Sequence, residues 1–345
     1  MKIKKINYTP YKKSLKKSFY NSQNKYSYTE GVIIELIISH SSKSIIGYGE
    51  ASILAGFSND NIQKINWGIE SFIAGIEFGY DYSLDELLNL AEIQCHDLPS
   101  LHFAIDTALY DLTGKIQQLP LSTLLNIQSA TSVEFSELYM PYNKPNFNQN
   151  LIMKYKLGVN EISDDIKILN DLVKNNQSIH FRFDANQLYT ETEFFEVVKK
   201  LQHFNIDYFE EPIINLSSAA LKRINNTLTI NIAIDESLYN GKNYLKWIEN
   251  NWIHSVVIKP SIFGGYKKNL KLYKQCKAQN INIILSSSLE DSIGNMATIH
   301  LAASINNKLT HGLNIHNFYD EFVYTPVYLK NASSVNVDKL IGLGI

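Results

Sequence analysis

Six apolar segments recur at regular intervals in the second half of the chain, and five of them end in an ionisable residue. The intervals are 28, 26, 25, 24 and 27 residues between predicted strand ends at Lys156, Asp184, Glu210, Asp235, Lys259 and Ser286. A strand, a helix and two loops take roughly 25 to 30 residues, so this rhythm is typical of consecutive βα units. Two more predicted strand ends, at Tyr139 and Asn314, bring the number to eight, which is enough to close a barrel.

The first third of the chain has a different pattern. Residues 31–38 and 45–51 are rich in β-branched residues and flank a polar turn, which predicts an antiparallel hairpin. Residues 62–76 and 84–95 have helical apolar spacing, and a further helix is expected over 101–117 with Ser100 as its N-cap. Strands followed by helices are an α+β pattern.

The two patterns together predict an α/β protein with two domains. A length of 345 residues suits a barrel of about 250 residues plus a smaller partner. We expect an α+β capping domain over residues 1–105 and a modified TIM barrel, (β/α)7β, over 106–324, with its active site at the carboxyl ends of the strands. The tail, 325–345, is expected to pack on the capping domain.

Bulk composition excludes several classes of function. The net charge is −2, so neither a nucleic acid nor an anionic membrane is expected as a partner. No run of 18 apolar residues occurs, and the basic segment 1–13 is not followed by the apolar stretch of a secretory signal. Cys95 and Cys276 lack metal-ligand spacing and fit a reducing compartment. A cytoplasmic enzyme with a small-molecule substrate is the resulting expectation, and the oligomeric state stays open.

The charged strand ends are the main evidence for chemistry. Apolar residues precede each one, and an unpaired buried charge costs several kcal/mol, so five in a ring must compensate one another or share an ion. The carboxylates of Asp184, Glu210 and Asp235 make an oxygen-rich site that suits a hard cation such as Mg²⁺. The absence of His and Cys at these positions argues against zinc.

Two lysines, Lys156 and Lys259, flank the three carboxylates along the chain. A lysine near a metal ion and another cation can have its pKa lowered and act as a general base. A metal ion would stabilise the enolate formed when a proton leaves the carbon next to a carboxylate. A single Asp or Lys at a strand end is usually a cap or a surface salt bridge, but five at barrel spacing favour a catalytic site.

These motifs resemble the enolase superfamily, in its muconate-cycloisomerase-like branch. Lys154-Tyr155-Lys156 is similar to the Lys-x-Lys motif, whose second lysine is the acid and base. The resemblance implies a (β/α)7β barrel with an α+β cap, in which the metal ligands are Asp184 (in Phe-Asp-Ala-Asn), Glu210 (in Glu-Glu-Pro) and Asp235 (in Asp-Glu-Ser). It also implies that Lys259, in Ile-Lys-Pro, is the opposite lysine.

Further motifs are similar to those of the o-succinylbenzoate synthase family within that branch. They lie at 49–52 with 56–58, at 99–104, at 286–294 and at 311–313. This resemblance implies a lyase of menaquinone biosynthesis that removes water from 2-succinyl-6-hydroxy-2,4-cyclohexadiene-1-carboxylate to form 2-succinylbenzoate. Mg²⁺ is the implied cofactor, with Mn²⁺ as a possible substitute.

The resemblance implies a separate role for each of these residues. Lys156 removes the proton and returns it to the departing hydroxyl, and Lys259 stabilises the anion as a cation. Side chains expected to bind substrate are Lys154, Arg182, Asn186, Ser286 and Ser287. Glu211 and Glu236 are expected to support the metal ligands, and the histidines His300, His311 and His316 to be structural.

Two alternatives remain open. The same site could serve an N-acylamino acid racemase or a dipeptide epimerase, since these also need both lysines. The segment 315–320 lacks the Asp-x-Asp expected of a dipeptide epimerase, and the loop 18–25 lacks an arginine to bind a carboxylate. A non-catalytic binding barrel is disfavoured, because such a protein would be expected to lose a ligand or a lysine.

Overall fold

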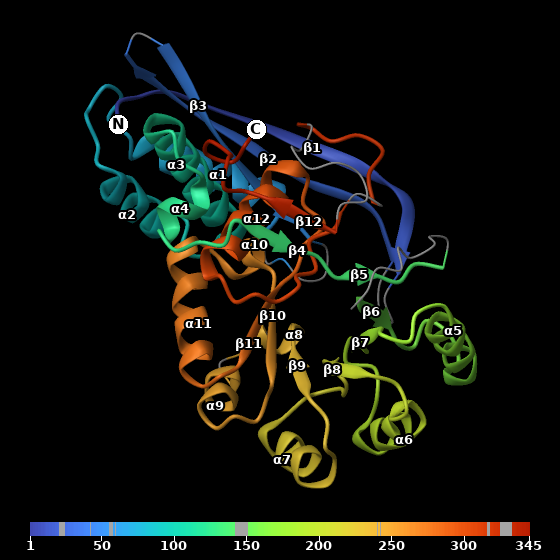
Figure 1. The fold of residues 1–345 in the computed structure, drawn as a ribbon. Helices are drawn as coiled ribbons and strands as arrows, with labels where there is room; N and C mark the ends of the chain where they lie inside the picture. Colours follow the sequence, from blue (N-terminus) through green and yellow to red (C-terminus); the bar gives the residue numbers. More distant parts are fainter. Residues whose placement is uncertain are drawn as a thin grey trace.

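A computed structural model describes residues 1–20, 25–41, 43–54, 58, 60–141, 151–239, 241, 243–315, 318–324 and 333–345. An antiparallel sheet with helices on it forms the upper part of the molecule in Figure 1, and a curled parallel sheet surrounded by helices forms the lower part. Most of the predicted motif at 56–58 and parts of the loops at 18–25 and 315–320 lie outside the described residues.

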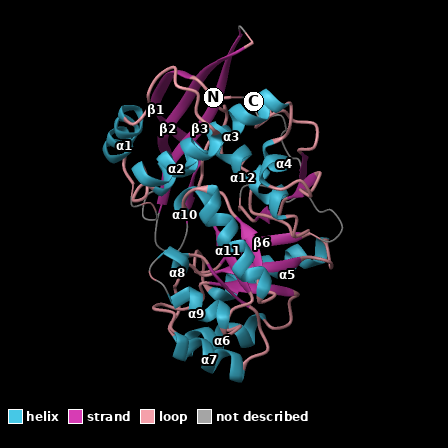
Figure 2. Ribbon diagram, turned by 90° about the vertical axis from the view of Figure 1, so that its left-hand side faces the viewer, coloured by secondary structure: helices cyan, strands magenta, loops and turns pink. Residues whose placement is uncertain are grey.

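The upper sheet consists of β1 (Ile3–Tyr20), β2 (Lys25–His40) and β3 (Lys43–Ile53), in that order and antiparallel. The predicted hairpin is therefore confirmed as β2 and β3. Helices α1 (Ile62–Ala74), α2 (Leu84–Gln94) and α3 (Pro99–Gln117) pack beside this sheet (Figure 2).

Two glycines of β3 allow α3 to lie directly against the sheet. A Cβ at Gly47 would stand 2.2 Å from the carbonyl oxygen of Ala108, and one at Gly49 would stand 1.9 Å from that of Ala104. No side chain fits at such distances, so the Gly-x-Gly pattern in the strand permits backbone-to-backbone packing.

The start of α3 differs from the prediction. The helix begins at Pro99 and has Leu98 at its N-cap position, without a side-chain cap. Proline suits the first helical position because its missing N–H would lack an intrahelical partner there. Ser100, the predicted N-cap, lies inside the helix, and its backbone N–H donates a 2.9 Å hydrogen bond to Asp60.

The lower sheet is parallel and has seven strands in sequence order. They are β5 (Glu137–Leu138), β6 (Ile152–Lys156), β7 (His180–Asp184), β8 (Ile206–Glu210), β9 (Ile232–Ile234), β10 (Ser255–Ile258) and β11 (Asn282–Leu285). In place of a full eighth strand, parallel bridges from His311 to Phe135 and from Gly312 to Ser286 join the two edges. The barrel closes as (β/α)7β, with the eighth segment ending before the predicted Asn314.

Helices and one small sheet complete the lower part. The helices are α4 (Leu121–Leu125), α5 (Ile162–Asn175), α6 (Glu191–Leu201), α7 (Ser218–Thr227), α8 (Glu236–Tyr239), α9 (Asn243–Glu249), α10 (Pro260–Phe263), α11 (Tyr266–Ala278) and α12 (Ser292–Ile305). The small sheet pairs β4 (Ser132–Glu134) with β12 (Ser334–Asn336). None of the helices in the described part of the chain has both the length and the apolarity to cross a bilayer.

The helix α3 joins the two parts. It packs on β3 and on α10, and the tail lies against its second half, where the N–H of Leu343 donates to Asp111 at 2.8 Å. The backbones of Gly114 and Gly342 are in close contact, because a Cβ added at Gly114 would stand 2.7 Å from the Cα of Gly342. The predicted boundary at residue 105 falls inside this helix, so the division into domains remains a proposal.

Candidate active site

The carboxyl ends of the parallel strands carry the charged residues of the site. Register places Lys156, Asp184 and Glu210 opposite one another on β6, β7 and β8. Residues paired on adjacent strands point to the same face of the sheet. Lys154 points to this face too, because it lies two residues before Lys156. Hydrophobic residues precede these positions on each strand and are buried, so the strands hold the charged ends in place.

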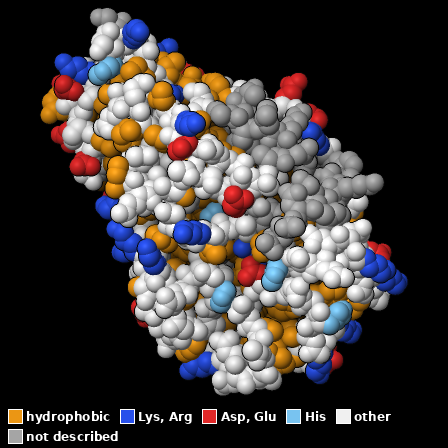
Figure 3. Space-filling model, viewed as in Figure 1, with side chains coloured by type: hydrophobic (Ala, Val, Ile, Leu, Met, Phe, Trp, Pro, Cys, Tyr) orange, Lys and Arg blue, Asp and Glu red, His pale blue; other side chains and the backbone are white. Residues whose placement is uncertain are grey.

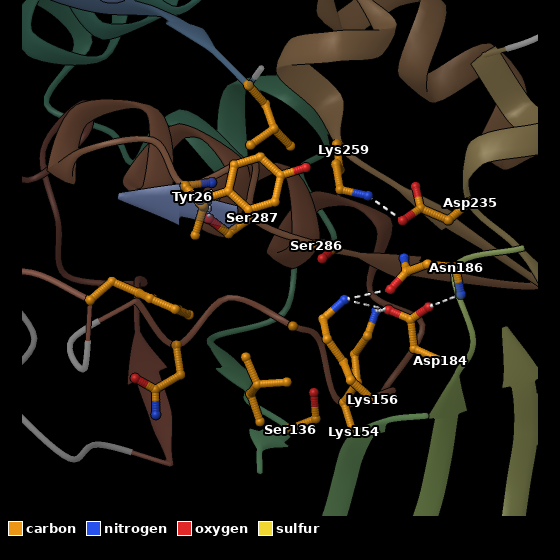
Figure 4. A pocket seen from close by; sticks show the side chains of 16 residues that line it. Tyr26, Ser136, Lys154, Lys156, Asp184, Asn186, Asp235, Lys259, Ser286 and Ser287 are labelled. Atoms are coloured by element: carbon orange, nitrogen blue, oxygen red, sulfur yellow. Dashed lines mark hydrogen bonds and ion pairs between the residues drawn. The ribbon is translucent and has the colours of Figure 1, made fainter. Parts of the chain in front are cut away.

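Figure 4 shows the pocket into which these side chains project. It is lined by the charged residues Lys154, Lys156, Asp184, Asp235 and Lys259 together with Asn186, Ser286 and Ser287, all of which the sequence singled out. Glu210 is fully buried beside them and pairs with Lys154. The structure therefore brings these predicted residues together although the outermost two, Lys154 and Ser287, lie 133 positions apart.

Each carboxylate meets a lysine. The Nζ of Lys154 donates to both oxygens of Glu210 at 2.8 Å and lies 2.9 Å from Oδ2 of Asp184. The Nζ of Lys156 lies 2.9 Å from the same Oδ2, and Lys259 donates to Oδ2 of Asp235. The five predicted charges thus compensate one another, with Lys154 as an additional cation.

The environment shifts the pKa values of these groups in opposite directions. Burial disfavours ionisation of Asp184, but Lys154 and Lys156 outweigh it and hold its pKa below the ordinary 3.8. Burial and the nearby charge of Asp184 raise the pKa of Glu210 to about 8, against the pull of Lys154. Burial alone would lower the pKa of Lys154, but Asp184 and Glu210 raise it well above 10.5. Carboxylates this close repel one another and favour a cation between them.

Two buried carboxylate oxygens at the site have no hydrogen-bond partner within the described part of the chain. Among the described residues, neither Oδ1 of Asp235 nor Oε2 of Glu236 has a hydrogen-bond partner, although both atoms are buried. The described residues include no group of three His, Cys, Asp or Glu side chains arranged as a metal centre, because lysines stand between the carboxylates. An unpartnered buried carboxylate oxygen beside two further carboxylates still fits a hard cation in its donor chemistry.

A second layer of contacts supports the carboxylates. Glu211 accepts hydrogen bonds from the N–H of Asp235 at 2.9 Å and from the N–H of Ser237 at 2.7 Å. Asn186 accepts from Lys156 at 3.0 Å and donates to Glu236 at 2.8 Å. Asn186 and Glu211 have φ values of 46° and 41°, and such left-handed backbone outside glycine is concentrated at functional sites.

Arg182 does not lie with the other candidates. Its Nε donates to Asp207 at 2.8 Å and its Nη1 to the carbonyl of Thr310 at 2.9 Å, and it is not among the pocket-lining residues of the described chain. Arg182 therefore pairs with the carboxylate of Asp207. Its predicted role in substrate binding has no support from this position.

Several pocket residues were not predicted as site residues. Tyr26 comes from the capping sheet and Ser136 precedes β5. Leu289 and Phe318 come from the segments 286–294 and 315–320, which were noted as motifs without a role for these two side chains. Behind the pocket, Tyr239 accepts a 2.7 Å hydrogen bond from the backbone N–H of Lys259. These side chains carry no charge, so the pattern of charged strand ends gave no signal for them.

Two of the histidines have structural positions. His300 on α12 is fully buried, and its Nδ1 accepts the N–H of Ser122 at 3.2 Å. His311 accepts the N–H of Leu285 at 3.0 Å. Burial lowers the pKa of His300 to about 4 and that of His311 to about 3, so both are neutral in the folded protein near pH 7. His316 lies outside the described residues.

The depressed pKa of His300 predicts a loss of stability in acid. The folded state resists protonation down to about pH 4, whereas the unfolded chain takes up a proton near 6.5. Stability is therefore complete above pH 6.5 and falls as the pH drops towards 4, by about 3 kcal/mol for this residue. Chemical denaturation of His300→Asn, whose Oδ1 can accept the Ser122 N–H, should show a shallower fall than the wild type. An equally steep fall would contradict the assignment.

The fold and the pocket place the protein in a class of barrel enzymes in which lysines and carboxylates meet at the carboxyl ends of the strands. Residues 151–345 match the family described as enolase C-terminal domain-like. The chain belongs to this family, within the muconate-cycloisomerase-like branch of the enolase superfamily. The fold and family predicted from the sequence are confirmed.

Relatives with different activities are about equally similar. A hydrophobic dipeptide epimerase of Enterococcus faecalis is 25% identical over 320 residues, which is 89% of this chain and 88% of the relative. An o-succinylbenzoate synthase of Pasteurella multocida is 26% identical over 310 residues, 86% of this chain and 85% of the relative. The relatives are enzymes, but their names differ in the reaction.

Solved structures agree on the fold. The dipeptide epimerase of Enterococcus faecalis complexed with Mg and L-Leu-L-Tyr has a TM-score of 0.84 at 22% identity and covers 100% of this chain and 99% of its own. An N-succinyl Arg/Lys racemase of Bacillus cereus has a TM-score of 0.84 at 21% identity, with 100% and 95% covered. The choice among reactions therefore rests on the pocket.

Proposed function

We propose that this protein is an o-succinylbenzoate synthase, which removes water from 2-succinyl-6-hydroxy-2,4-cyclohexadiene-1-carboxylate. The observation that carries the proposal is the distribution of charge in the pocket. Its described acidic lining residues, Asp184 and Asp235, both lie against lysines. Apart from these acidic residues and the lysines, the described lining residues have hydroxyl, amide or apolar side chains or are glycine. Such a pocket suits an anionic substrate with an uncharged ring and offers no free carboxylate to a substrate ammonium group.

The position of the last barrel segment supports the same choice. Gly312 and Asn314 line the pocket there, and both are uncharged. A dipeptide carries an α-ammonium group, and a buried cation needs a counter-charge. Neutral residues at this position therefore favour a carboxylate substrate over a dipeptide.

We further propose that Asp184, Glu210 and Asp235 hold Mg²⁺, with Glu211 and Glu236 behind them, and that Mn²⁺ can substitute. Two observations support this donor set: Oδ1 of Asp235 has no partner among the described residues, and Glu210 is buried next to the charge of Asp184. When bound, the ion would supply positive charge that stabilises a substrate carboxylate as it gains electron density.

Lys156 is the proposed acid and base. Its neutral amine takes the proton from the ring carbon next to the carboxylate, and the electron pair moves into that carboxylate. The pair then returns, the neighbouring carbon–hydroxyl bond breaks, and the Lys156 ammonium protonates the departing hydroxide to give water and an aromatic ring. Asn186 orients the amine through its 3.0 Å hydrogen bond.

Lys259 enters the pocket from a different side than Lys156 (Figure 4) and would stabilise the developing anion as a cation. Ser286 and Ser287 line the pocket, which supports a role for them in contacting the succinyl tail. Lys154 already donates to both oxygens of Glu210, so a hydrogen bond to the substrate would come in addition to that pair.

The direct test is a spectrophotometric assay of dehydration with purified protein and Mg²⁺. We expect 2-succinylbenzoate to form at a rate far above the uncatalysed reaction. Calorimetry first establishes that the protein binds Mg²⁺ under the assay conditions. Absence of product from this Mg²⁺-bound protein would overturn the proposal. A role in menaquinone biosynthesis would imply a small-molecule carboxylate substrate and a cytoplasmic location.

Racemisation of N-acylamino acids is the second candidate, because Lys156 and Lys259 reach the pocket from different strands, β6 and the end of β10. Two bases on two sides of a substrate can exchange a proton with inversion. Incubation with an N-succinylamino acid in D₂O, followed by mass spectrometry of the α-hydrogen, separates this activity from dehydration. Figure 3 shows both acidic and basic side chains on the face it presents.

A further inference from the structure

A buried carboxylate of the capping sheet reaches the barrel at the start of α12. Oε1 of Glu50, on β3, accepts the N–H of Asp291 at 2.7 Å, and Oε2 accepts the N–H of Gly294 at 2.8 Å. Glu50 is 1% exposed. The first N–H groups of a helix lack intrahelical partners and attract negative charge, so this side chain stabilises the start of α12 from 241 residues away.

The contact needs a glycine in the first turn of the helix. A Cβ at position 294 would stand 2.9 Å from Cβ of Glu290 and 3.3 Å from Oε2 of Glu50. The Ile-Gly at 293–294 therefore belongs to the same arrangement as the Gly-Glu at 49–50, which the sequence singled out as a motif without giving it a role.

The capping sheet holds this junction from a second strand. Oη of Tyr11, on β1, donates to Glu50 at 2.6 Å. Lys13, also on β1, pairs at 2.5 Å with Asp291, the N-cap residue of α12, and lies 4.7 Å from the ring centroid of Tyr319. Two strands of the cap thus converge on one helix start.

The segment just before α12 forms part of the pocket. Ser286, Ser287 and Leu289 line it, and Leu289 has a φ of 61°, a left-handed conformation that is unfavourable for a branched side chain. Oη of Tyr319 donates to the carbonyl of Leu289 at 2.5 Å. A segment in this conformation keeps its shape only while its surroundings hold both of its ends.

We propose that Glu50 is a positioning residue, which ties the capping sheet to α12 and thereby sets the place of residues 286–289 in the pocket. Glu50 does not line the pocket and acts through the helix start. The segment it holds lines the pocket, so its effect is expected on substrate binding. The expected rise in KM and the choice of substrate in the kinetic test rest on the proposed function, whereas the tie itself does not.

The test compares Glu50→Gln with Glu35→Gln, a matched change on the neighbouring strand β2 whose carboxylate accepts from Asn7 at 2.9 Å. In glutamine an NH₂ group replaces one carboxylate oxygen. This donor would face another donor, either a backbone N–H of α12 or the Tyr11 hydroxyl, and one hydrogen bond would be lost. Hydrogen exchange at the amides of Asp291 and Gly294 should be about tenfold faster in Glu50→Gln, without a comparable change across β6 to β8. In the dehydration assay KM should rise about tenfold with kcat within about threefold, and Glu35→Gln should match the wild type in both measurements.

Unchanged exchange at these two amides, or an unchanged KM, would overturn the proposal. So would faster exchange throughout the protein with a lower apparent kcat at unchanged KM, which indicates loss of folded protein and a purely structural role. If Glu50→Gln does not fold, the same two measurements are made on Tyr11→Phe. This variant removes one hydrogen bond to Glu50 and keeps the ring, so the changes in exchange rate and KM should be in the same direction but smaller. A wild type without dehydratase activity would overturn the proposed function alone, because the exchange measurement needs no substrate and tests the tie by itself.

Discussion

Replacing Lys156 by alanine is expected to lower the dehydration rate by on the order of 10⁴-fold while Mg²⁺ still binds. The large effect follows because one amine both removes the proton and returns it to the leaving hydroxyl, and general acid–base groups contribute about 10² to 10⁴ each. The fold should survive, because Asp184 keeps its ion pair with Lys154 at 2.9 Å. The rate is measured spectrophotometrically and metal binding by isothermal titration calorimetry.

A matched control is Lys167→Ala. Lys167 lies on the exposed face of α5 and pairs only at the surface with Asp164, at 2.8 Å. Such pairs are worth little, so this variant should retain wild-type turnover. Full turnover by Lys156→Ala would contradict the assignment of the acid and base, and loss of Mg²⁺ binding along with turnover would assign Lys156 to the integrity of the site instead.

Removal of the divalent ion is expected to lower the rate by on the order of 10³-fold, because a bound cation supplies several kcal/mol of charge stabilisation. The proposed ligands Asp184, Glu210 and Asp235 have lysines as counter-charges, so the fold of the site should survive removal of the ion. Dialysis against EDTA followed by the dehydration assay measures the loss, and added Mg²⁺ should restore the rate.

The control for chelation is EDTA already saturated with Mg²⁺, which should leave the rate unchanged. Asp235→Asn gives an independent measure, because it removes charge from the residue whose Oδ1 has no partner among the described residues. Calorimetry should show weaker Mg²⁺ binding in this variant. A wild-type rate in EDTA would rule out the proposed metal dependence.

Much of the barrel was predictable from local pattern. The ends of β6, β7 and β8 match the predicted Lys156, Asp184 and Glu210, and β9, β10 and β11 end one residue before the predicted Asp235, Lys259 and Ser286. Buried parallel strands are nearly continuous apolar runs, and a charge at the end of such a run marks its boundary clearly. The last barrel segment was harder to predict because it makes only isolated bridges, at His311 and Gly312.

The start of α3 shows where local signals compete. Pro99 and Ser100 are both good residues for a helix start, and either reading was consistent with the sequence. Ser100 hydrogen-bonds Asp60, a residue 40 positions earlier, so tertiary contact placed it inside the helix.

The sequence by itself determined which residues could carry the chemistry, because charge at the end of an apolar strand is a local property. The pairing of those charges was decided only by the tertiary structure. Lys154 turned out to share Glu210 and Asp184, while Arg182, at the same offset on the next strand, pairs with Asp207 away from the pocket. Likewise Glu50 reaches α12, and Tyr26 enters the pocket, because separate parts of the chain pack together. Ion pairs and hydrogen bonds depend on distances of about 3 Å between groups far apart in sequence, and spacing along the chain carries no record of those distances.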